Sequence, residues 1–162
     1  MYSITKDGVC AKHLCVIDEK AKSVSTTEDW LVVDFGDQYG WTFKTGSNCT
    51  FKTGSGCTFN TGHYCTFNTG HYCTFNTGPY CTFKTGYNCT FNTGYNCTFK
   101  VGDNCCLIRY DLKGVVELMS GVTIRLTDVG YEYNRDEYIE TMSVNEEKLV
   151  FKLSNEEWVT VH

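Results

Sequence analysis

The sequence predicts a mainly β fold: a parallel β-solenoid, of the β-roll or β-helix type, followed by a small β-rich domain. Three observations support this fold class. Residues recur with a period of eight, apolar and polar residues alternate inside each unit, and a glycine follows each alternating segment at a fixed place. A fixed period is typical of repeat architectures, and alternation with a period of two is typical of strands.

The period is clearest in CTFNTGHYCTFNTGHYCTFNTGPY, which fills residues 57–80, and closely related octads cover 41–104. We number the places of an octad from one to eight, beginning at Cys. Two degenerate octads, VDFGDQYG from Val33 and CCLIRYDL from Cys105, keep apolar residues at the first and third places. Ten octads therefore span 33–112, the predicted solenoid domain.

Each octad predicts a short strand and a turn. The first and third side chains should point into the core and the second and fourth outward, because successive side chains of a strand alternate. The glycine at the sixth place is expected where the backbone turns with a positive φ. The predicted core consists of Phe43, Phe51, Phe59, Phe67, Phe75, Phe83, Phe91, Phe99, Cys49, Cys57, Cys65, Cys73, Cys81, Cys89 and Cys97.

Two octads per coil give a flattened roll with 16 residues in each coil, and three give a triangular helix with 24. We favour 16, because residues 33–112 then divide into five whole coils. This register stacks Asn60, Asn76 and Asn92 on one outward face. The opposite face then carries Lys52, Asn68, Lys84 and Lys100.

The flanking segments lack the period. Residues 1–32 are predicted to form an N-terminal cap with a hairpin around Asp7 and Gly8, because solenoids need their end strands covered. The segment 30–35 is predicted to be the strand that enters the roll.

Residues 113–162 are predicted to form an acidic β-rich domain that packs on the rod or pairs with a second copy as a homodimer. Its strands alternate around a turn at Ser120 and Gly121. The segments LVFKL and WVTV are predicted to form a hairpin, and RDEYIETM, from Arg135, is open between a helix and a strand.

Composition and cysteine content indicate what class of protein this is. The chain has 162 residues, of which 41% are hydrophobic, enough for a core. We expect a cytoplasmic protein, because no apolar stretch is long enough to span a membrane and the first residues lack the features of a signal peptide. The 11 Cys are an odd number and most follow the octad period. We therefore expect reduced, buried thiols that act as small core residues.

The variable seventh and eighth places carry the candidate contact residues. Rigid aromatic side chains with a polar tip are typical contact anchors, although the same rings can simply shield a corner of the coil. The Lys residues sort mainly onto one face. The candidate partner-binding residues are Tyr64, Tyr72, Tyr80, Tyr87, Tyr95, His63, His71, Lys52, Lys84 and Lys100.

No catalytic or metal centre is predicted. Cys10, His13 and Cys15 are close in sequence but lack the paired spacing of a zinc site. His63 and His71 fall on turns, while the Cys residues beside them should point inward. The sequence contains no nucleophile elbow, no phosphate-binding loop and no HExxH motif. We expect neither an enzyme nor a bound cofactor.

Charge argues against direct nucleic-acid binding and against mimicry of DNA. The octads at 41–104 contain four Lys and one Asp, whereas 105–162 contain six basic and eleven acidic residues. A DNA-binding surface needs more Lys and Arg than the octads supply, and a mimic of DNA needs dense carboxylates along the rod. The acidic C-terminal part remains able to meet a basic partner surface.

The octads C-T-F-x-T-G-x-x at 41–104, with the ending VGDNCCLIRYD at 101–111, resemble octapeptide-repeat proteins of phage and bacteria. This resemblance implies a solenoid encoded by a phage or another mobile element, and it implies no particular activity. A looser similarity connects the octads to pentapeptide-repeat β-helices, whose period is five rather than eight.

We expect a non-enzymatic interaction protein that uses a rigid β-solenoid to bind a host macromolecule and to block or redirect it. The expected partner is a host protein, for example a defence component. One alternative is a structural rod or cap of a virion or appendage. Another is an ice-binding or glycan-binding solenoid, which the regular Thr rows favour and the interrupting Lys residues oppose.

Overall fold

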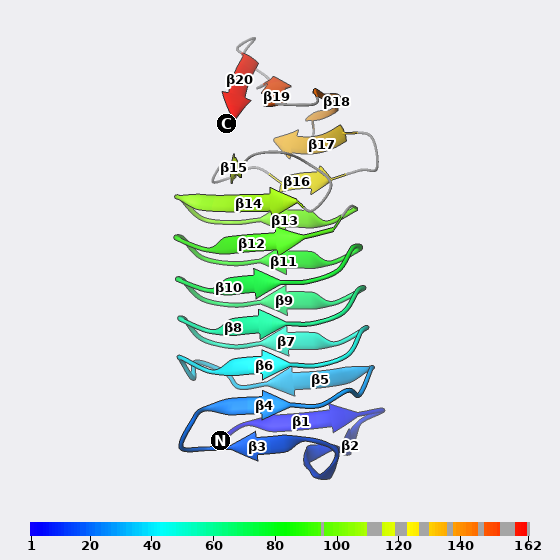
Figure 1. The fold of residues 1–162 in the computed structure, drawn as a ribbon, viewed down its shortest axis with the longest axis vertical. Helices are drawn as coiled ribbons and strands as arrows, with labels where there is room; N and C mark the ends of the chain where they lie inside the picture. The colour runs from blue at the N-terminus through cyan, green and yellow to red at the C-terminus, as the bar shows by residue number, and fades with distance from the viewer. Residues whose placement is uncertain are drawn as a thin grey trace.

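The computed structural model describes residues 1–94 and 96–109 and, after them, the strand segments 115–118, 123–126, 130–135, 138–145, 148–152 and 158–161. Figure 1 shows a parallel β-solenoid, a rod of coils stacked on one another. The rod has about five turns with about 16 residues in each turn. The fold class predicted from the sequence is confirmed.

The strands form two sheets. In spatial order, the 12-stranded sheet contains β2 (Val9–Cys10), β1 (Ser3–Lys6), β5 (Leu31–Asp34), β7 (Thr50–Lys52), β9 (Thr66–Asn68), β11 (Thr82–Lys84), β13 (Thr98–Lys100), β16 (Thr123–Leu126), β17 (Gly130–Arg135), β18 (Tyr138–Asn145), β19 (Lys148–Lys152) and β20 (Trp158–Val161). The 8-stranded sheet contains β15 (Val115–Leu118), β14 (Cys105–Arg109), β12 (Thr90–Thr93), β10 (Thr74–Asn76), β8 (Thr58–Asn60), β6 (Thr42–Lys44), β4 (Ser23–Ser25) and β3 (Val16–Asp18).

Strands of neighbouring coils pair in parallel and in register. Thr74 of β10 pairs with Thr58 of β8 on one side and with Thr90 of β12 on the other. Equal places therefore stack at every sixteenth residue, which confirms two octads per coil. Both predicted ladders form: Asn60, Asn76 and Asn92 lie in register in one sheet, and Lys52, Asn68, Lys84 and Lys100 lie in register in the other.

The core lies between the two sheets and consists of two files of Phe rings. Within a file the rings are nearly parallel; Phe67 and Phe83, for example, are 5.0 Å apart with 3° between their planes. Between the files the rings meet edge to face, as Phe67 and Phe75 do at 5.1 Å. Every predicted Phe and Cys of the core is buried. Each fully buried Phe contributes roughly 1.5–3 kcal/mol to stability.

The first coil departs from the predicted register. We expected an octad that begins at Val33, but Val33 pairs with Phe51 and so takes the third place, with Leu31 at the first. Parallel pairing also begins before the predicted solenoid, at β4, where Val24 pairs with Phe43. Valines at the Phe place and longer corners hide the repeat in this part of the sequence.

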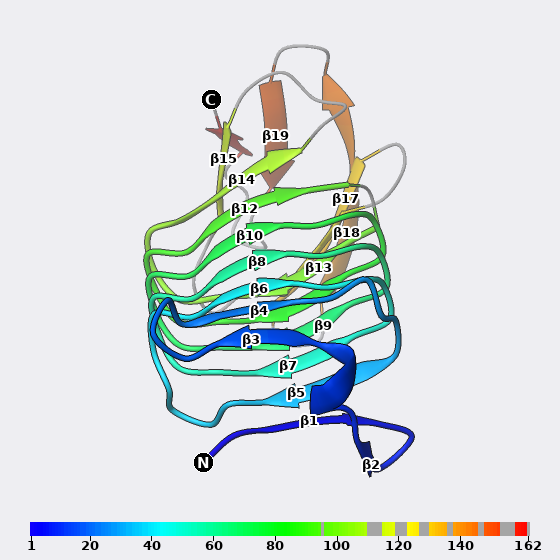
Figure 2. The same cartoon turned by 60° about the horizontal axis from the view of Figure 1, so that its bottom comes forward.

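Antiparallel strands close the N-terminal end of the rod (Figure 2). β1 pairs with β5, and β3 pairs with β4. β1 and β2 form the predicted hairpin, whose turn holds Asp7 at φ 52° and Gly8 at φ 77°. A short 3₁₀ helix, Lys12–Leu14, follows.

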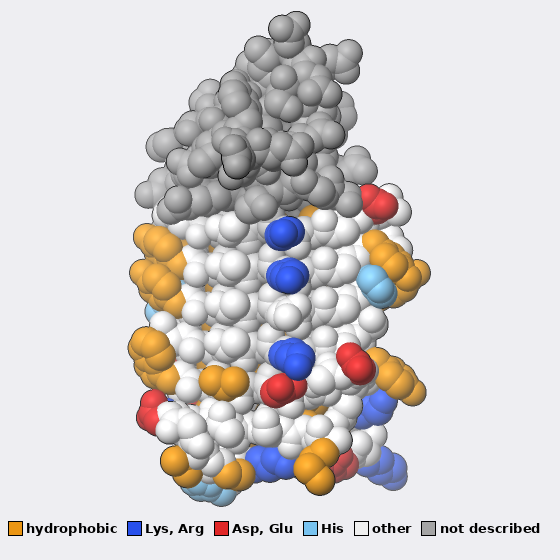
Figure 3. All heavy atoms as spheres, turned by 180° about the vertical axis from the view of Figure 1, so that it is seen from behind, with side chains coloured by type: hydrophobic (Ala, Val, Ile, Leu, Met, Phe, Trp, Pro, Cys, Tyr) orange, Lys and Arg blue, Asp and Glu red, His pale blue; other side chains and the backbone are white. Residues whose placement is uncertain are grey.

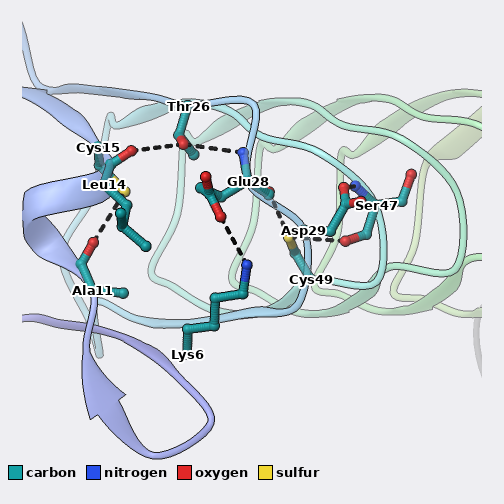
Figure 4. A network of polar contacts seen from close by, with 9 residues as sticks. All are labelled: Lys6, Ala11, Leu14, Cys15, Thr26, Glu28, Asp29, Ser47 and Cys49. Carbon is teal, nitrogen blue, oxygen red and sulfur yellow. Dashed lines mark hydrogen bonds and ion pairs between the residues drawn. The ribbon is translucent and has the colours of Figure 1, made fainter.

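Side-chain hydrogen bonds fix this cap to the first coils (Figure 4). Lys6 Nζ lies 2.7 Å from Glu28 Oε2, and Thr26 Oγ1 donates to the Leu14 carbonyl at 2.8 Å. Asp29 Oδ1 accepts the backbone N–H of Ser47 at 2.6 Å. These contacts add to the backbone hydrogen bonds between the first coils, such as that from Gly46 N–H to the Glu28 carbonyl at 3.1 Å.

At the other end the pairing becomes antiparallel. β15 pairs with β14 and β16 with β13, so the strands before and after the predicted turn join different sheets. Ser120 and Gly121 themselves lie outside the described residues. β19 and β20 form the predicted hairpin, and the segment left open between helix and strand contributes β18. No helix in the described part of the chain has the length and hydropathy of a membrane span.

Candidate interaction surfaces

The seventh and eighth places of the octads form two corners that run along the rod. The first corner contains residues 29–30, 47–48, 63–64, 79–80 and 96, and the second contains 39–40, 55–56, 71–72, 87–88 and 103–104. Backbone hydrogen bonds join successive coils at both corners: Asn48 N–H donates to the His63 carbonyl at 2.9 Å, and Tyr72 N–H donates to the Tyr87 carbonyl at 3.0 Å.

Positive φ occurs at the eighth place, not at the sixth where we expected it. In the octads from Trp41 to Asn104 the values at this place range from 54° to 66°, at Asn48, Gly56, Tyr64, Tyr72, Tyr80, Asn88, Asn96 and Asn104. The sixth-place glycine is needed for a different reason, which is close contact between coils. A Cβ on Gly54 would lie 2.4 Å from the carbonyl oxygen of Asp37 in the preceding coil.

Three corner tyrosines therefore have an unfavourable backbone conformation. Tyr64, Tyr72 and Tyr80 hold φ at 56°, 57° and 61°. Asn and Gly adopt this region readily, but bulky side chains rarely do. Non-glycine residues held in sparsely populated regions cost on the order of 1–3 kcal/mol each and cluster at functional sites.

The tyrosine side chains nevertheless point outward. At the first corner Tyr64 is 53% exposed, and its ring stacks on Tyr80 at 4.7 Å with 6° between the planes. At the second corner Tyr72 is 60% exposed and meets Tyr87 edge to face at 5.3 Å. The predicted tyrosines thus divide between two surfaces on opposite edges of the rod. Tyr95 lies outside the described residues.

Two further exposed aromatic residues extend the corners, and the sequence prediction missed both. Trp30 lies at the first corner, where its backbone N–H donates to the Ser47 carbonyl at 3.1 Å. Tyr39 lies at the second corner, in the coil before Ser55. Counting back from Leu31 and Trp41, which take first places, assigns Trp30 to an eighth place and Tyr39 to a seventh place.

The two predicted histidines face their own corners rather than each other. His63 Nδ1 lies 3.1 Å from Ser47 Oγ. His71 stacks on Tyr87 at 3.8 Å, and its Nδ1 accepts the Tyr87 N–H at 3.2 Å. Among the residues whose side chains are placed, no three His, Cys, Asp or Glu lie close enough together to hold a metal ion.

The predicted Lys residues form a single column on the 12-stranded sheet. Figure 3 shows this column along the middle of one face, with hydrophobic side chains at both edges. Lys52 lies 3.8 Å from Asp34 Oδ2, the one carboxylate in the described region that reaches this column. The column is separate from the aromatic corners, so the predicted contact residues form three surfaces.

The octad thiols are buried and hydrogen-bonded. Cys81 Sγ accepts the Cys65 N–H at 3.4 Å and donates to the Gly62 carbonyl at 3.7 Å. All cysteines are free thiols. Contact with the Cys65 thiol, together with burial, raises the pKa of Cys49 far above its usual value. The thiols therefore serve as small core groups that satisfy backbone donors and acceptors.

Comparisons with known proteins found no matching family model, no curated protein of significant similarity and no matching solved structure. The chain is a β-solenoid of 16-residue coils rich in Thr, Cys and Phe.

Proposed function

We propose that the protein is a non-enzymatic interaction module whose rigid solenoid presents its two aromatic corners to a partner protein. The observation that carries this proposal is the positive φ of Tyr64, Tyr72 and Tyr80, in three consecutive octads. At the same place other octads use Asn or Gly, which adopt that conformation at lower cost. Tyrosine there lowers stability, so contact with a partner accounts for its presence.

A protein is the partner class that fits these surfaces. Tyr and Trp supply large, rigid contact areas with little conformational entropy to lose, and they dominate protein interfaces. The rigid stack of coils holds the rings in place before contact, which lowers the entropy lost on binding. The likeness of the octads to repeat proteins of phage and bacteria is the reason for naming a host protein, which the bound module would block or redirect.

A capture experiment tests this function. Tagged full-length protein is incubated with nuclease-treated bacterial lysate, and bound proteins are identified by mass spectrometry and then purified for direct binding. The test variant carries Tyr64→Asn, Tyr72→Asn and Tyr80→Asn together. The control variant carries Asn60→Ala and Asn76→Ala, on the flat face of β8 and β10.

The proposal predicts one protein bound in a fixed ratio, retained by the control and lost by the tyrosine variant. The purified partner should bind the purified protein directly. Equal capture by all three forms would show that the corners do not bind it. Recovery of the protein alone, as a self-assembled species, would favour the structural rod instead.

A further inference from the structure

An open groove of about 580 Å³ includes part of the second corner but none of Tyr64, Tyr72 and Tyr80. Its floor consists of the Thr and Gly of the fifth and sixth places in two coils, after β7 and β9. The other side chains of the lining are polar or aromatic: Asp37, Tyr39, Lys52, Ser55, Asn68 and His71. The volume lies within the range of small-molecule sites.

The groove is bounded by a corner that breaks the repeat. In regular coils the N–H of a sixth-place residue donates to the carbonyl of the sixth place in the preceding coil, as Gly70 N–H does to Gly54. Gly54 N–H donates to the Gln38 carbonyl, so Gln38 takes the sixth place. Phe35 takes the fifth, because its N–H donates to the Lys52 carbonyl. Gly36 and Asp37 are therefore inserted between the two places. They form a turn, closed by Gln38 N–H to the Phe35 carbonyl at 3.0 Å, and both inserted residues line the groove.

The lining supplies hydrogen-bond donors and acceptors close together. Asn68 offers both an amide donor and an acceptor, and Asp37 offers carboxylate acceptors. Ser55 Oγ accepts the backbone N–H of His71 at 3.0 Å, so the hydroxyl proton of Ser55 remains available to a ligand. Tyr87 N–H occupies Nδ1 of His71, so the neutral ring carries its proton on Nε2 as a further donor.

Charge and polarity disfavour two ligand classes. Lys52, the one Lys in the lining, lies 3.8 Å from the Asp34 carboxylate. Asp37 adds a second negative charge, and Lys22, which contacts Tyr39, adds a second positive charge. Without a net positive charge, the groove does not favour a polyanion. Polar side chains also line the groove, so a lipid or an apolar ligand would leave polar groups without partners.

Tyr39 gives the groove a fixed aromatic surface. Lys22 Nζ lies 4.1 Å from the centre of the Tyr39 ring and donates to the Tyr39 carbonyl oxygen at 3.2 Å. These contacts hold the ring from one side. Tyr39 remains 68% exposed. An aromatic face beside convergent polar groups matches a sugar ring, which has an apolar C–H face and a rim of hydroxyls.

We infer that this groove binds a neutral oligosaccharide. The sugar ring packs on Tyr39, and its hydroxyls bond to Asp37, Asn68, Ser55 and Lys52. Neighbouring strands are about 4.8 Å apart, so groups on β7 and β9 address successive sugar units along the rod. The groove shares Tyr39, Ser55 and His71 with the second corner but contains none of the tyrosines with positive φ, so this inference does not rest on the proposed function.

The test is a titration of ¹⁵N-labelled full-length protein, followed by backbone amide shifts in NMR. The probes are maltotetraose, cellotetraose and chitotetraose at millimolar concentrations, with a heparin tetrasaccharide as the anionic comparison. We expect saturable shifts for at least one neutral probe, confined to Gly54, Ser55, Asn68, Gly70 and His71. Tyr39→Ala should weaken that binding roughly tenfold or more, and Asn76→Ala, on the opposite sheet, should not change it.

Three results would overturn the inference: no shift with any neutral probe, stronger binding of the heparin tetrasaccharide, or shifts centred on another surface. Unchanged affinity in Tyr39→Ala would also overturn it. Because Tyr39 is exposed, the Tyr39→Ala variant should have the same melting temperature as the natural chain. Weaker binding by this variant will then reflect a change in the groove and not in the fold. The tyrosine variant Tyr64→Asn, Tyr72→Asn, Tyr80→Asn should still bind the sugar, which keeps this test distinct from the capture experiment.

Discussion

The ring of Phe59 stacks on the ring of Phe75 with 4.9 Å between centroids and 5° between planes. Phe75 repeats this contact with Phe91 at 4.8 Å and meets Phe83 of the other file edge to face at 5.1 Å. Each central ring thus supports the coils on both sides of it. Stability in such a stack is a sum over neighbouring coils, so a central ring matters more than its own burial suggests.

Phe75→Ala should lower the unfolding free energy by about 3–5 kcal/mol, because it leaves a cavity between two stacked rings. Phe75→Leu keeps most of the volume and should cost on the order of 1 kcal/mol. Denaturation with urea, followed by circular dichroism, measures both. A loss below 1 kcal/mol for Phe75→Ala would contradict continuous stacking.

The sixth-place glycines should differ in their tolerance of alanine. A Cβ on Gly54 would meet the Asp37 carbonyl oxygen at 2.4 Å, whereas a Cβ on Gly78 has its nearest neighbours at 3.3 Å. Gly54→Ala should therefore cost on the order of 2 kcal/mol or more, and Gly78→Ala much less. Similar melting temperatures for the two variants would show that close contact does not explain these glycines.

The buried thiol of Cys65 should make the protein less stable at alkaline pH. Contact with Cys49 lowers the pKa of Cys65, but contact with Cys81 and burial raise it more, to about 11 from a usual value of 9.0. Between these values the unfolded chain has lost a proton that the folded chain keeps. The contribution of Cys65 to the unfolding free energy should thus be constant below about pH 8 and decline from pH 9 to 11. Cys65→Ala should decline less steeply, and identical slopes would contradict the assignment.

Thiol labelling should distinguish the exposed cysteine from those of the octads. Cys10 is exposed, whereas the eight cysteines from Cys49 to Cys105 at the first place are buried. In native buffer at neutral pH, Cys10 should react with a thiol reagent within minutes. The octad thiols should react only on unfolding, and denaturant should reveal all 11. Rapid native labelling of any octad thiol would contradict the closed core.

Much of the fold could be predicted because one short unit repeats. The alternation of Cys, Thr, Phe and Asn or Lys determines which side chains point inward, and the count of octads favours 16 residues per coil. The place that turns with a positive φ could not be predicted, because a glycine is compatible both with positive φ and with close packing between coils. Only the structure separates these causes, at Gly54 and Asn48.

The candidate sites were less accessible to prediction than the fold. The tyrosines were found because they occupy variable places, but their positive φ depends on the backbone. Trp30 and the groove were missed, because the first coil replaces Phe by Val24 and Val33 and lengthens its corners. Tyr39 was missed although the octad from Val33 already placed it at the variable seventh place. An insertion of two residues hides the period where the surface becomes irregular.

The central claim is that the corner tyrosines serve contact and not stability. The most direct test is the unfolding free energy of Tyr72→Asn, with Asn88→Tyr as the reverse substitution at the same place of the next octad on that corner. Tyr72→Asn should raise the unfolding free energy by about 1 kcal/mol, because Asn adopts this backbone conformation more easily, and Asn88→Tyr should lower it by a similar amount. A loss of 1 kcal/mol or more in Tyr72→Asn would mean that the ring shields its corner, and it would contradict the account.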